Sequence, residues 1–302
     1  MSKFTKYVGK FTLMSFVLIL SISLYTIYSL NIYYKESESI QSMDSALILT
    51  KNLLEEEELR ALSLSILLSQ NKEFLKEYFS KNRRATFDVI NKKINTLKMF
   101  QNYNFEVQVH DKNLNTYIRN WDFNITDIPL SSFREGLVLT KKRKAPLVSI
   151  ENGKRLNIKA ISPILKDGEF VGSIEVIQGF EHLRKKLLEH GYNLFILLNK
   201  NNITSDKKFK DYKYINDEFI LVNELYEKNS YNALKNSNLK NLKAYGYFSQ
   251  DDFYFGYFEI NNFNNKGLGY CIVSFENINQ LYLKSHYKHT VFDDNSSKVT
   301  IR

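Results

Sequence analysis

The feature that most constrains this chain is an uncharged apolar run near its N-terminus, from Phe11 to Tyr34. Its 24 residues would make a helix roughly 36 Å long, which is enough to cross a hydrocarbon core of about 30 Å. Lysines precede the run, acidic residues follow it, and tyrosines gather at its C-terminal end. The pattern predicts a transmembrane helix over residues 11–34, with residues 1–10 in the cytoplasm.

A cleaved signal peptide is the alternative interpretation of this run. The apolar stretch is longer than the core of a signal peptide, and no small-x-small cleavage site follows it, so an uncleaved anchor is favoured. No second run of about 18 apolar residues occurs in the sequence. We therefore expect a single-pass protein of the bacterial inner membrane, with the bulk of the chain periplasmic or extracellular.

The formal net charge of +9 raises the question of nucleic-acid binding. Acidic residues are interleaved throughout the 302-residue chain, and no basic stripe with spaced aromatics is present. The composition therefore predicts no nucleic-acid partner. The single cysteine, Cys271, lies in an apolar run and is expected to be a buried strand thiol.

Motifs for catalysis, cofactors and metals are missing from the sequence. There is no His-Glu-x-x-His, no Gly-x-Ser-x-Gly and no phosphate loop. His286 and His289 have helical spacing, but they lie in a polar tail without acidic or cysteine neighbours. We expect no enzyme activity, no cofactor and no metal site.

The exported part begins with a long helical pattern. Apolar residues recur at helical spacing from Ser39 to Tyr78, and no proline interrupts them. The pattern predicts a long stalk helix within residues 35–84. Such a rod would hold a domain away from the membrane, and a homodimer or a signalling partner would engage it.

Residues 85–190 carry strand signals and form the predicted membrane-distal module. Apolar and polar residues alternate from Phe105 to His110, and a strand from Tyr117 to Trp121 would place Tyr117, Arg119 and Trp121 on one face. A short helix opened by Pro129 and Ser131 follows, and then two hairpins turn at Asn152-Gly153 and Asp167-Gly168. This order predicts an antiparallel sheet with helices on one side.

Residues 191–283 repeat this order more loosely. Strands are predicted over residues 194–198, 219–222, 244–249, 253–260 and 268–275, and a helix over residues 223–235. One architectural unit would thus be used twice in tandem. The predicted fold is α+β, and residues 284–302 form a polar C-terminal tail.

A resemblance to a known family lies between Arg119 and Gly179. The matching segments, in order, are Arg119-Asn120-Trp121-Asp122, Leu130-Ser131-Ser132-Phe133-Arg134, Ser149-Ile150-Glu151-Asn152-Gly153-Lys154, Ile161-Ser162-Pro163-Ile164 and residues 167–179. Together they resemble the double Cache sensor family of bacterial chemoreceptors and sensor kinases. The resemblance implies two tandem PAS-like modules with antiparallel sheets. It also implies that the membrane-distal module binds a small extracellular molecule for chemotaxis or signal transduction.

Two departures from the family pattern affect the prediction. Members often carry arginines at the positions of Lys154 and Lys159, and a lysine keeps the charge but lacks the planar fork that suits a carboxylate. Family receptors usually continue into a second membrane helix and a cytoplasmic signalling domain, which we do not find. We therefore expect either a partner protein that transmits the signal or a truncated receptor.

The candidate ligand-binding residues come from three places in the distal module. Arg119 and Trp121 share a strand face, and a cation beside an aromatic ring suits a small organic anion. Phe133 and Arg134 would come from the helix over the sheet, and Lys159 and Glu175 from adjacent strands. The expected ligand is a carboxylate, an amino acid or an amine. The rival prediction is an anchored structural or interaction protein whose modules have no ligand.

Two short motifs resemble the acidic sequon of bacterial N-glycosylation. Asn124-Ile125-Thr126 is preceded by Asp122, and Asn295-Ser296-Ser297 is preceded by Asp293.

Overall fold

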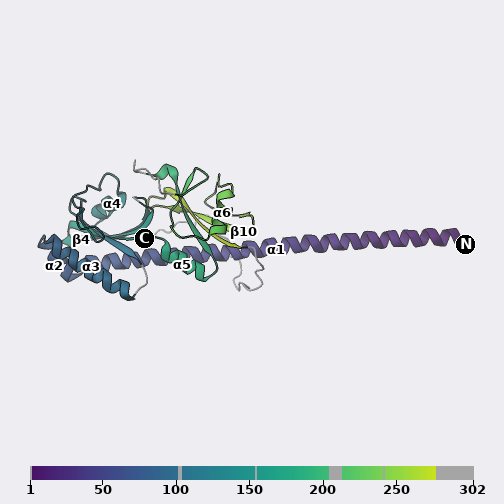
Figure 1. Cartoon of the computed structure of the whole chain (residues 1–302), viewed down its shortest axis with the longest axis horizontal. Coiled ribbons are helices and arrows are strands. Elements are labelled where there is room, and N and C mark those ends of the chain that lie inside the picture. The colour runs from purple at the N-terminus through teal and green to yellow at the C-terminus, as the bar shows by residue number, and fades with distance from the viewer. Residues whose placement is uncertain (1, 101–103, 154, 204–212, 241, 277–302) are drawn as a thin grey trace.

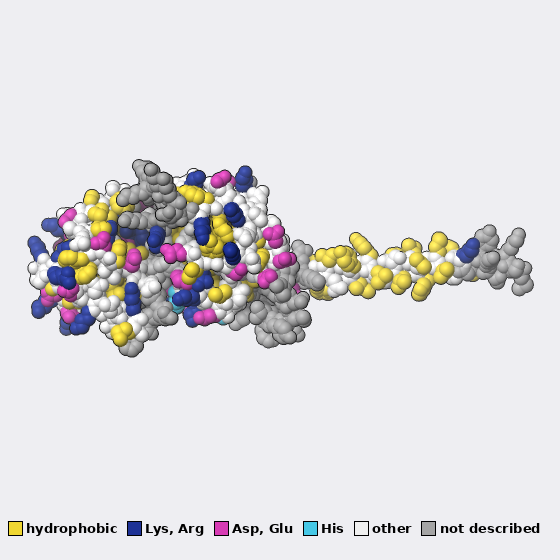
Figure 2. All heavy atoms as spheres, viewed as in Figure 1, with side chains coloured by type: hydrophobic (Ala, Val, Ile, Leu, Met, Phe, Trp, Pro, Cys, Tyr) yellow, Lys and Arg dark blue, Asp and Glu magenta, His cyan; other side chains and the backbone are white. Residues whose placement is uncertain are grey.

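The helix α1, from Ser2 to Ser69, is the axis of the molecule. The computed structural model describes residues 2–100, 104–153, 155–203, 213–240 and 242–276. The first half of α1 projects beyond two modules that lie side by side along its second half (Figure 1). Apolar side chains cover the projecting part, whereas charged side chains of both signs spread over the globular part (Figure 2). Among the described residues, α1 is the one helix long and apolar enough to cross a membrane.

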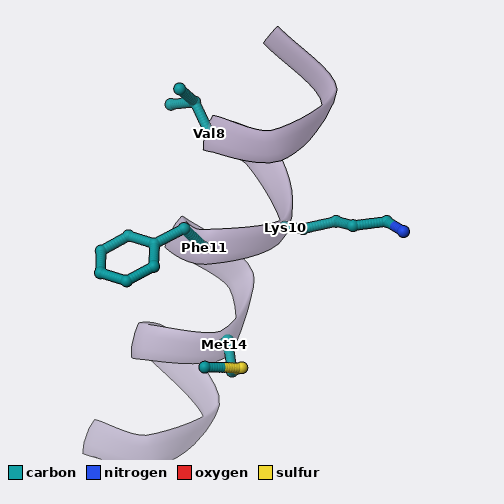
Figure 3. Close-up of a pocket in the computed structure, with 4 residues that line it drawn as sticks. All are labelled: Val8, Lys10, Phe11 and Met14. Atoms are coloured by element: carbon teal, nitrogen blue, oxygen red, sulfur yellow. The ribbon is translucent and has the colours of Figure 1, made fainter. Parts of the chain in front are cut away.

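A shallow hollow lies on the N-terminal part of α1, where Val8, Lys10, Phe11 and Met14 line it (Figure 3). These four side chains belong to neighbouring turns of one helix. Ligand sites are normally enclosed by several elements. The hollow is therefore a feature of an exposed helix surface, and we do not treat it as a candidate site.

The long stalk helix predicted over residues 35–84 is three helices in the structure. α1 ends at Ser69, and the side chain of Asn71 accepts a hydrogen bond from the backbone N–H of Phe74 at 3.1 Å. Asn71 thereby caps a new helix, because its side chain replaces a backbone partner at the first turn. The two further helices are α2, Lys72–Phe79, and α3, Arg83–Phe100.

The distal module contains a five-stranded antiparallel sheet with the order β2-β1-β5-β4-β3. The β4–β5 hairpin turns at Asp167 and Gly168, whose φ angles of 52° and 78° are those of the type I′ turn that Asp-Gly favours. The strands are β1 Phe105–Asp111, β2 Thr116–Arg119, β3 Leu147–Glu151, β4 Asn157–Lys166 and β5 Glu169–Gln178.

Both faces of the distal sheet are covered, although the sequence predicted helices on one side. Apolar residues such as Ile158 and Val176 face α1, where Ser65 Oγ and Ser162 Oγ share a hydrogen bond of 2.8 Å. The helix α4, Glu135–Arg143, lies on the opposite face (Figure 1). Side chains on that face are therefore buried rather than solvated.

The proximal module contains a six-stranded sheet with the order β7-β8-β6-β11-β10-β9. It repeats the distal arrangement, since α1 covers one face and α6 the other (Figure 1). The helix α5, Glu181–Glu189, leads from the distal module to the proximal one. The proximal elements are β6 Asn193–Asn199, the 3₁₀ turn η1 Lys200–Asn202, β7 Lys213–Ile215, β8 Phe219–Leu221, α6 Lys228–Asn236, β9 Tyr245–Gln250, β10 Phe253–Asn261 and β11 Gly267–Glu276. The predicted α+β fold with tandem antiparallel modules is confirmed.

One hydrophobic core joins α1 to both modules. Met43 and Leu47 of α1, Ile158 of the distal sheet and Val273 of the proximal sheet belong to the same cluster of buried residues. Gly256 permits the close approach of α1 to β10, because a Cβ at this position would lie 2.4 Å from Met43 Sδ. The predicted burial of Cys271 in a strand is also confirmed.

Candidate functional site: the charged face of the distal sheet

The face of the distal sheet beneath α4 is lined by charged and polar side chains. Strand register places them together, because directly paired residues of antiparallel strands point to the same side. Gln108 of β1 pairs with Arg119 of β2 and with Glu175 of β5. Lys159 of β4 pairs with Ser149 of β3. We call this set the charged face; its buried polar members are Gln108, His110, Thr116, Arg119, Ser149, Glu151, Lys159, Ser173 and Glu175.

Arg134 lies over the centre of the charged face, just before the first turn of α4. Its guanidinium donates to both carboxylate oxygens of Glu175 and, at 3.4 Å from Nε, to Glu151 Oε2. Burial alone would raise the pKa of Glu175, but Arg134, His110 and Lys159 together outweigh it and hold that pKa below its ordinary value. Arg134 therefore fastens the loop before α4 to two strands.

Gly136 allows the first turn of α4 to approach Glu151 closely. A Cβ at position 136 would lie 2.0 Å from Glu151 Oε1, so any side chain there would displace the carboxylate. The same oxygen accepts a hydrogen bond of 3.0 Å from Ser149 Oγ. The start of α4 is thus fitted to the acidic part of the charged face.

His110 is a fully buried histidine beside Glu175. Its Nδ1 shares a hydrogen bond of 3.0 Å with Ser173 Oγ. Its Nε2 lies 3.5 Å from Glu175 Oε2 and has no hydrogen-bond partner in the described chain. Burial lowers the pKa of His110 to about 4, so the imidazole is neutral at physiological pH.

Lys159 is a buried cation without a direct counterion among the described residues. Only 3% of the residue is exposed, and its ammonium makes no hydrogen bond or ion pair with any described residue. The β3–β4 turn lies close to it, since a Cβ at Gly153 would be 2.7 Å from Lys159 Nζ. Burial and the nearby Arg134 lower the pKa of Lys159 to about 8, which leaves it mainly protonated at neutral pH.

Arg119 and Trp121 lie together at the β2 edge of the charged face. The Arg119 guanidinium stands over the indole ring with 5.7 Å between guanidinium carbon and ring centroid. Its Nε donates to Gln108 Oε1 at 3.3 Å, and the Gln108 amide donates in turn to Thr116 Oγ1 at 3.1 Å. Arg119 is 8% exposed and Trp121 42% exposed. The indole therefore forms a rim between the buried charges and solvent.

The structure does not bring all the predicted residues together. Phe133 precedes α4, which begins at Glu135 and not near Pro129, and the side chain is 50% exposed. Tyr117 does not share a face with Arg119. It is the unpaired residue of a bulge in β2, and its ring contacts Tyr78 of α2. Lys159 and Glu175 are diagonal neighbours without a direct ion pair. Lys154 lies outside the described residues.

Sequence reasoning missed several members of the charged face. Gln108 and His110 alternate with valines, which predicts a solvated polar side. Glu151 carried no signal of its own beyond its place in the resemblance. Without knowing that α4 covers this face, their burial could not be inferred.

The charged face holds an excess of positive charge. Arg119, Arg134 and Lys159 are cationic, Glu151 and Glu175 are anionic, and His110 is neutral. Among these buried residues, three cations against two carboxylates leave one positive charge, which favours binding of an anion. Two further carboxylates, Asp122 and Glu106, are less buried and act on Arg119 from the side of the solvent. In the described ranges no group of three or more His, Cys, Asp or Glu residues could hold a metal ion.

The equivalent face of the proximal sheet is different in kind. The side chains between that sheet and α6 form an apolar cluster that includes Phe195, Phe255, Tyr257 and Leu234. Phe248 and Phe255 stack with ring centroids 4.8 Å apart. The same position in the two modules thus holds charges in the distal one and aromatic rings in the proximal one.

Comparison with known proteins identifies the family. A double Cache family model described as "Double sensory domain of two-component sensor kinase" matches residues 38–274. A comparison with curated protein sequences finds no match.

Several solved structures are similar to this chain. A domain described as the extracellular part of the histidine kinase vpHK1S-Z8 has a TM-score of 0.50 at 13% identity, covering 80% of this chain and 92% of that one. A domain of a sensory box/GGDEF family protein from Vibrio parahaemolyticus has a TM-score of 0.50 at 14% identity, covering 80% and 97%. The sensory domain of the Campylobacter jejuni chemoreceptor Tlp3 with isoleucine bound has a TM-score of 0.41 at 13% identity, covering 80% and 93%.

At these identities the structural likeness shows the fold alone. The family model, however, spans most of the chain, including α1 from residue 38 onward and both sheets. The chain therefore belongs to the double Cache family of sensory domains.

Proposed function

We propose that this protein senses a small organic molecule through the charged face of its distal module. The observation that carries the proposal is the surplus positive charge on a buried surface, with Lys159 unpaired among the described residues. A protein retains a buried, unpaired cation at a cost in stability. Binding an anion would remove that cost. The proximal module, whose equivalent face is an aromatic core, offers no comparable site among its described residues.

The charge of the site favours a ligand with a carboxylate. A carboxylate beside Arg119 would neutralise the surplus charge, and the Trp121 ring would cover an apolar portion of the ligand. An amino acid satisfies the same requirement, and Glu175 lies nearby for its ammonium group. A simple amine is the least favoured of the predicted ligands, because it would add a positive charge to a site that already has an excess.

A thermal-shift screen of the full-length protein in detergent micelles tests the proposal. The panel contains carboxylates, amino acids and amines, and a ligand that binds the folded state raises the melting temperature. A charge-assisted hydrogen bond contributes about 1.5–3 kcal/mol. Arg119→Ala should therefore weaken binding of a carboxylate hit by roughly 10- to 100-fold.

Arg155→Ala is the matched control for Arg119→Ala. Arg155 is also an arginine of the distal module, but its side chain is 68% exposed and pairs with Glu224 at the surface. The Arg155→Ala variant should bind the ligand found in the screen with the same affinity as the wild type. A panel without any hit, or equal losses in both variants, would count against recognition at the charged face.

We also infer that the protein is anchored by residues 11–34 with its modules on the outer side, and that a second copy or a signalling partner engages α1. The exposed Leu59 and Leu67 on the packed half of α1 support a helix partner. Leu67→Cys, crosslinked in native membranes, would report a neighbour, because the native Cys271 is buried and unreactive. Failure to crosslink at this position and at Leu59→Cys would exclude a partner on this face.

The rival is an anchored scaffold without a ligand. Its support comes from Arg134, whose hydrogen bonds are already satisfied by Glu151 and Glu175. A charged face that serves only to fasten α4 would give no thermal shift with any anion. The same screen therefore separates the two functions.

A further inference from the structure

The loop between β2 and α4, residues 120–134, carries one of the two acidic sequons. Arg83 of α3 is hydrogen-bonded to this loop. Its Nη2 donates to the carbonyl of Phe123 and, at 3.3 Å, to the carbonyl of Ile125. The Arg83 guanidinium also lies over the Phe123 ring, 4.1 Å from the centroid. The backbone on either side of Asn124 is therefore anchored, and Asn124 itself lies in a turn and is exposed.

The Asn124 side chain is available to an enzyme. The residue is exposed, and its carboxamide makes no hydrogen bond within the described chain. Its backbone N–H donates to Asp122 Oδ1 at 3.1 Å, so the acidic residue and the asparagine are held in one turn. Thr126 Oγ1 is committed only to a long hydrogen bond of 3.3 Å with the carbonyl of Thr116.

A second Asn-Ile-Thr triplet in the same chain provides a contrast. Asn202-Ile203-Thr204 has Lys200 instead of an acidic residue two positions before the asparagine. The Asn202 carboxamide donates to the carbonyls of Gly267 at 2.9 Å and Leu268 at 3.1 Å, which fixes it against β11. The triplet at Asn202 thus lacks both the charge and the free side chain that the triplet at Asn124 has.

We propose that Asn124 is an N-glycosylation acceptor for a bacterial oligosaccharyltransferase. The Asn124 amide nitrogen attacks the anomeric carbon of an oligosaccharide carried on a polyprenyl pyrophosphate. A C–N bond forms, the bond from the anomeric carbon to the pyrophosphate oxygen breaks, and the lipid pyrophosphate leaves with the electron pair while the amide proton passes to a base of the transferase. The Asp122 carboxylate gives the transferase an anionic recognition point, and the acceptor is a surface loop, as such sites require.

This inference depends on the exported orientation of the modules and not on ligand binding. Attachment at Asn124 would place the glycan three residues after Trp121, at the edge of the charged face. A failure of the ligand screen would leave the inference intact.

Expression of the full chain in a bacterium that carries an acidic-sequon transferase and its lipid-linked oligosaccharide tests the inference. Trypsin separates the three asparagines into peptides 120–134, 201–207 and 289–298. Peptide 120–134 should gain the mass of the oligosaccharide, and peptide 201–207 should not. The gain should be lost in Asn124→Gln and in Asp122→Lys, where the new lysine shortens the tryptic peptide to residues 123–134. It should be kept in Thr126→Ser, which preserves the hydroxyl and the hydrogen bond to Thr116.

Protease digestion of intact spheroplasts establishes that the modules are outside the cytoplasm. An exported chain whose peptide 120–134 stays unmodified would overturn the inference, as would a chain that is not exported. Modification that persists in Asp122→Lys, or that occurs equally on peptide 201–207, would also overturn it, because the acidic residue and the free carboxamide would then play no part.

Discussion

At the scale of single residues, Lys159 shows a conflict between stability and binding. Its pKa of about 8 means that keeping the ammonium charged in the folded state costs on the order of 3 kcal/mol at neutral pH. We expect Lys159→Met to raise the free energy of unfolding by about 1–3 kcal/mol, because an apolar side chain of similar length removes the buried charge. Urea unfolding at pH 7 measures the change.

The control for Lys159→Met is Lys166→Met, at the exposed end of the same strand. That variant should leave stability within about 0.5 kcal/mol of the wild type. Lys159→Met should also lose affinity for any anion found in the ligand screen. A variant that is less stable than the wild type would show that Lys159 has a structural partner and would remove the main support for an anion site.

Because His110 is buried as a neutral imidazole, we expect the protein to lose stability in mild acid. The unfolded chain binds a proton at the histidine below a pKa of about 6.5, whereas the folded state resists protonation until about pH 4. Between these values the unfolded state holds more protons, so stability falls as the pH is lowered. We expect a flatter dependence on pH between 6.5 and 4 in His110→Gln. Unfolding midpoints measured across this range test it, and an equal slope in both proteins would mean that His110 is not buried as a neutral imidazole.

At the scale of elements, Glu57 joins α1 to the end of the distal sheet. Its buried carboxylate accepts hydrogen bonds from the Gln178 amide at the end of β5 and from His182 Nδ1 in the first turn of α5. Arg60 of α1 pairs with the same carboxylate at 3.2 Å. Since Glu175 lies three residues before Gln178 on β5, this cluster connects a strand of the charged face to α1.

Removing the Glu57 carboxylate should loosen this junction. We expect Glu57→Ala to cost about 2–4 kcal/mol, because the buried partners lose a charged acceptor. Amide hydrogen exchange should accelerate at the start of α5 and at the end of β5. Glu56→Ala, which alters the exposed neighbouring residue, is the control, and equal exchange in the two variants would rule out Glu57 as a junction.

The sequence predicted most strands and a helix that overlaps α6, but not the end of the long helix at Ser69 or the position of α4 over the distal sheet. Alternation and turn chemistry are local, so the hairpin at Asp167-Gly168 and the strands that flank it follow from short segments. The helix ends at Ser69 because Asn71 caps the next helix. The apolar spacing continues through this position, so the spacing alone does not predict the end. The contacts of Arg134 with Glu151 and Glu175 depend on α4 covering the sheet. The contact between Arg119 and Trp121 could be predicted because the two residues are only two positions apart in the sequence.

At the scale of the whole molecule, the continuous core makes the two modules one folding unit. α1 contributes Met43 and Leu47 to the proximal module and Ala61 to the same buried cluster as the distal strands. Displacing α1 from one sheet should therefore weaken its packing on the other. A sensor built this way can transmit a change at the distal sheet along a single rigid helix.

Gly256→Leu tests whether the modules unfold together. The larger side chain would collide with Met43 and Leu47 and push α1 from β10, and overpacking of this kind costs about 1–3 kcal/mol. The chain has a single tryptophan, Trp121, and it lies in the distal module, so its fluorescence reports on a site remote from the substitution. If the core is shared, fluorescence and circular dichroism should give one coincident melting midpoint, lowered by about 5 °C. A circular dichroism transition that splits while the Trp121 midpoint stays unchanged would show that the proximal module unfolds alone, and α1 could not then act as a rigid connection between the sheets.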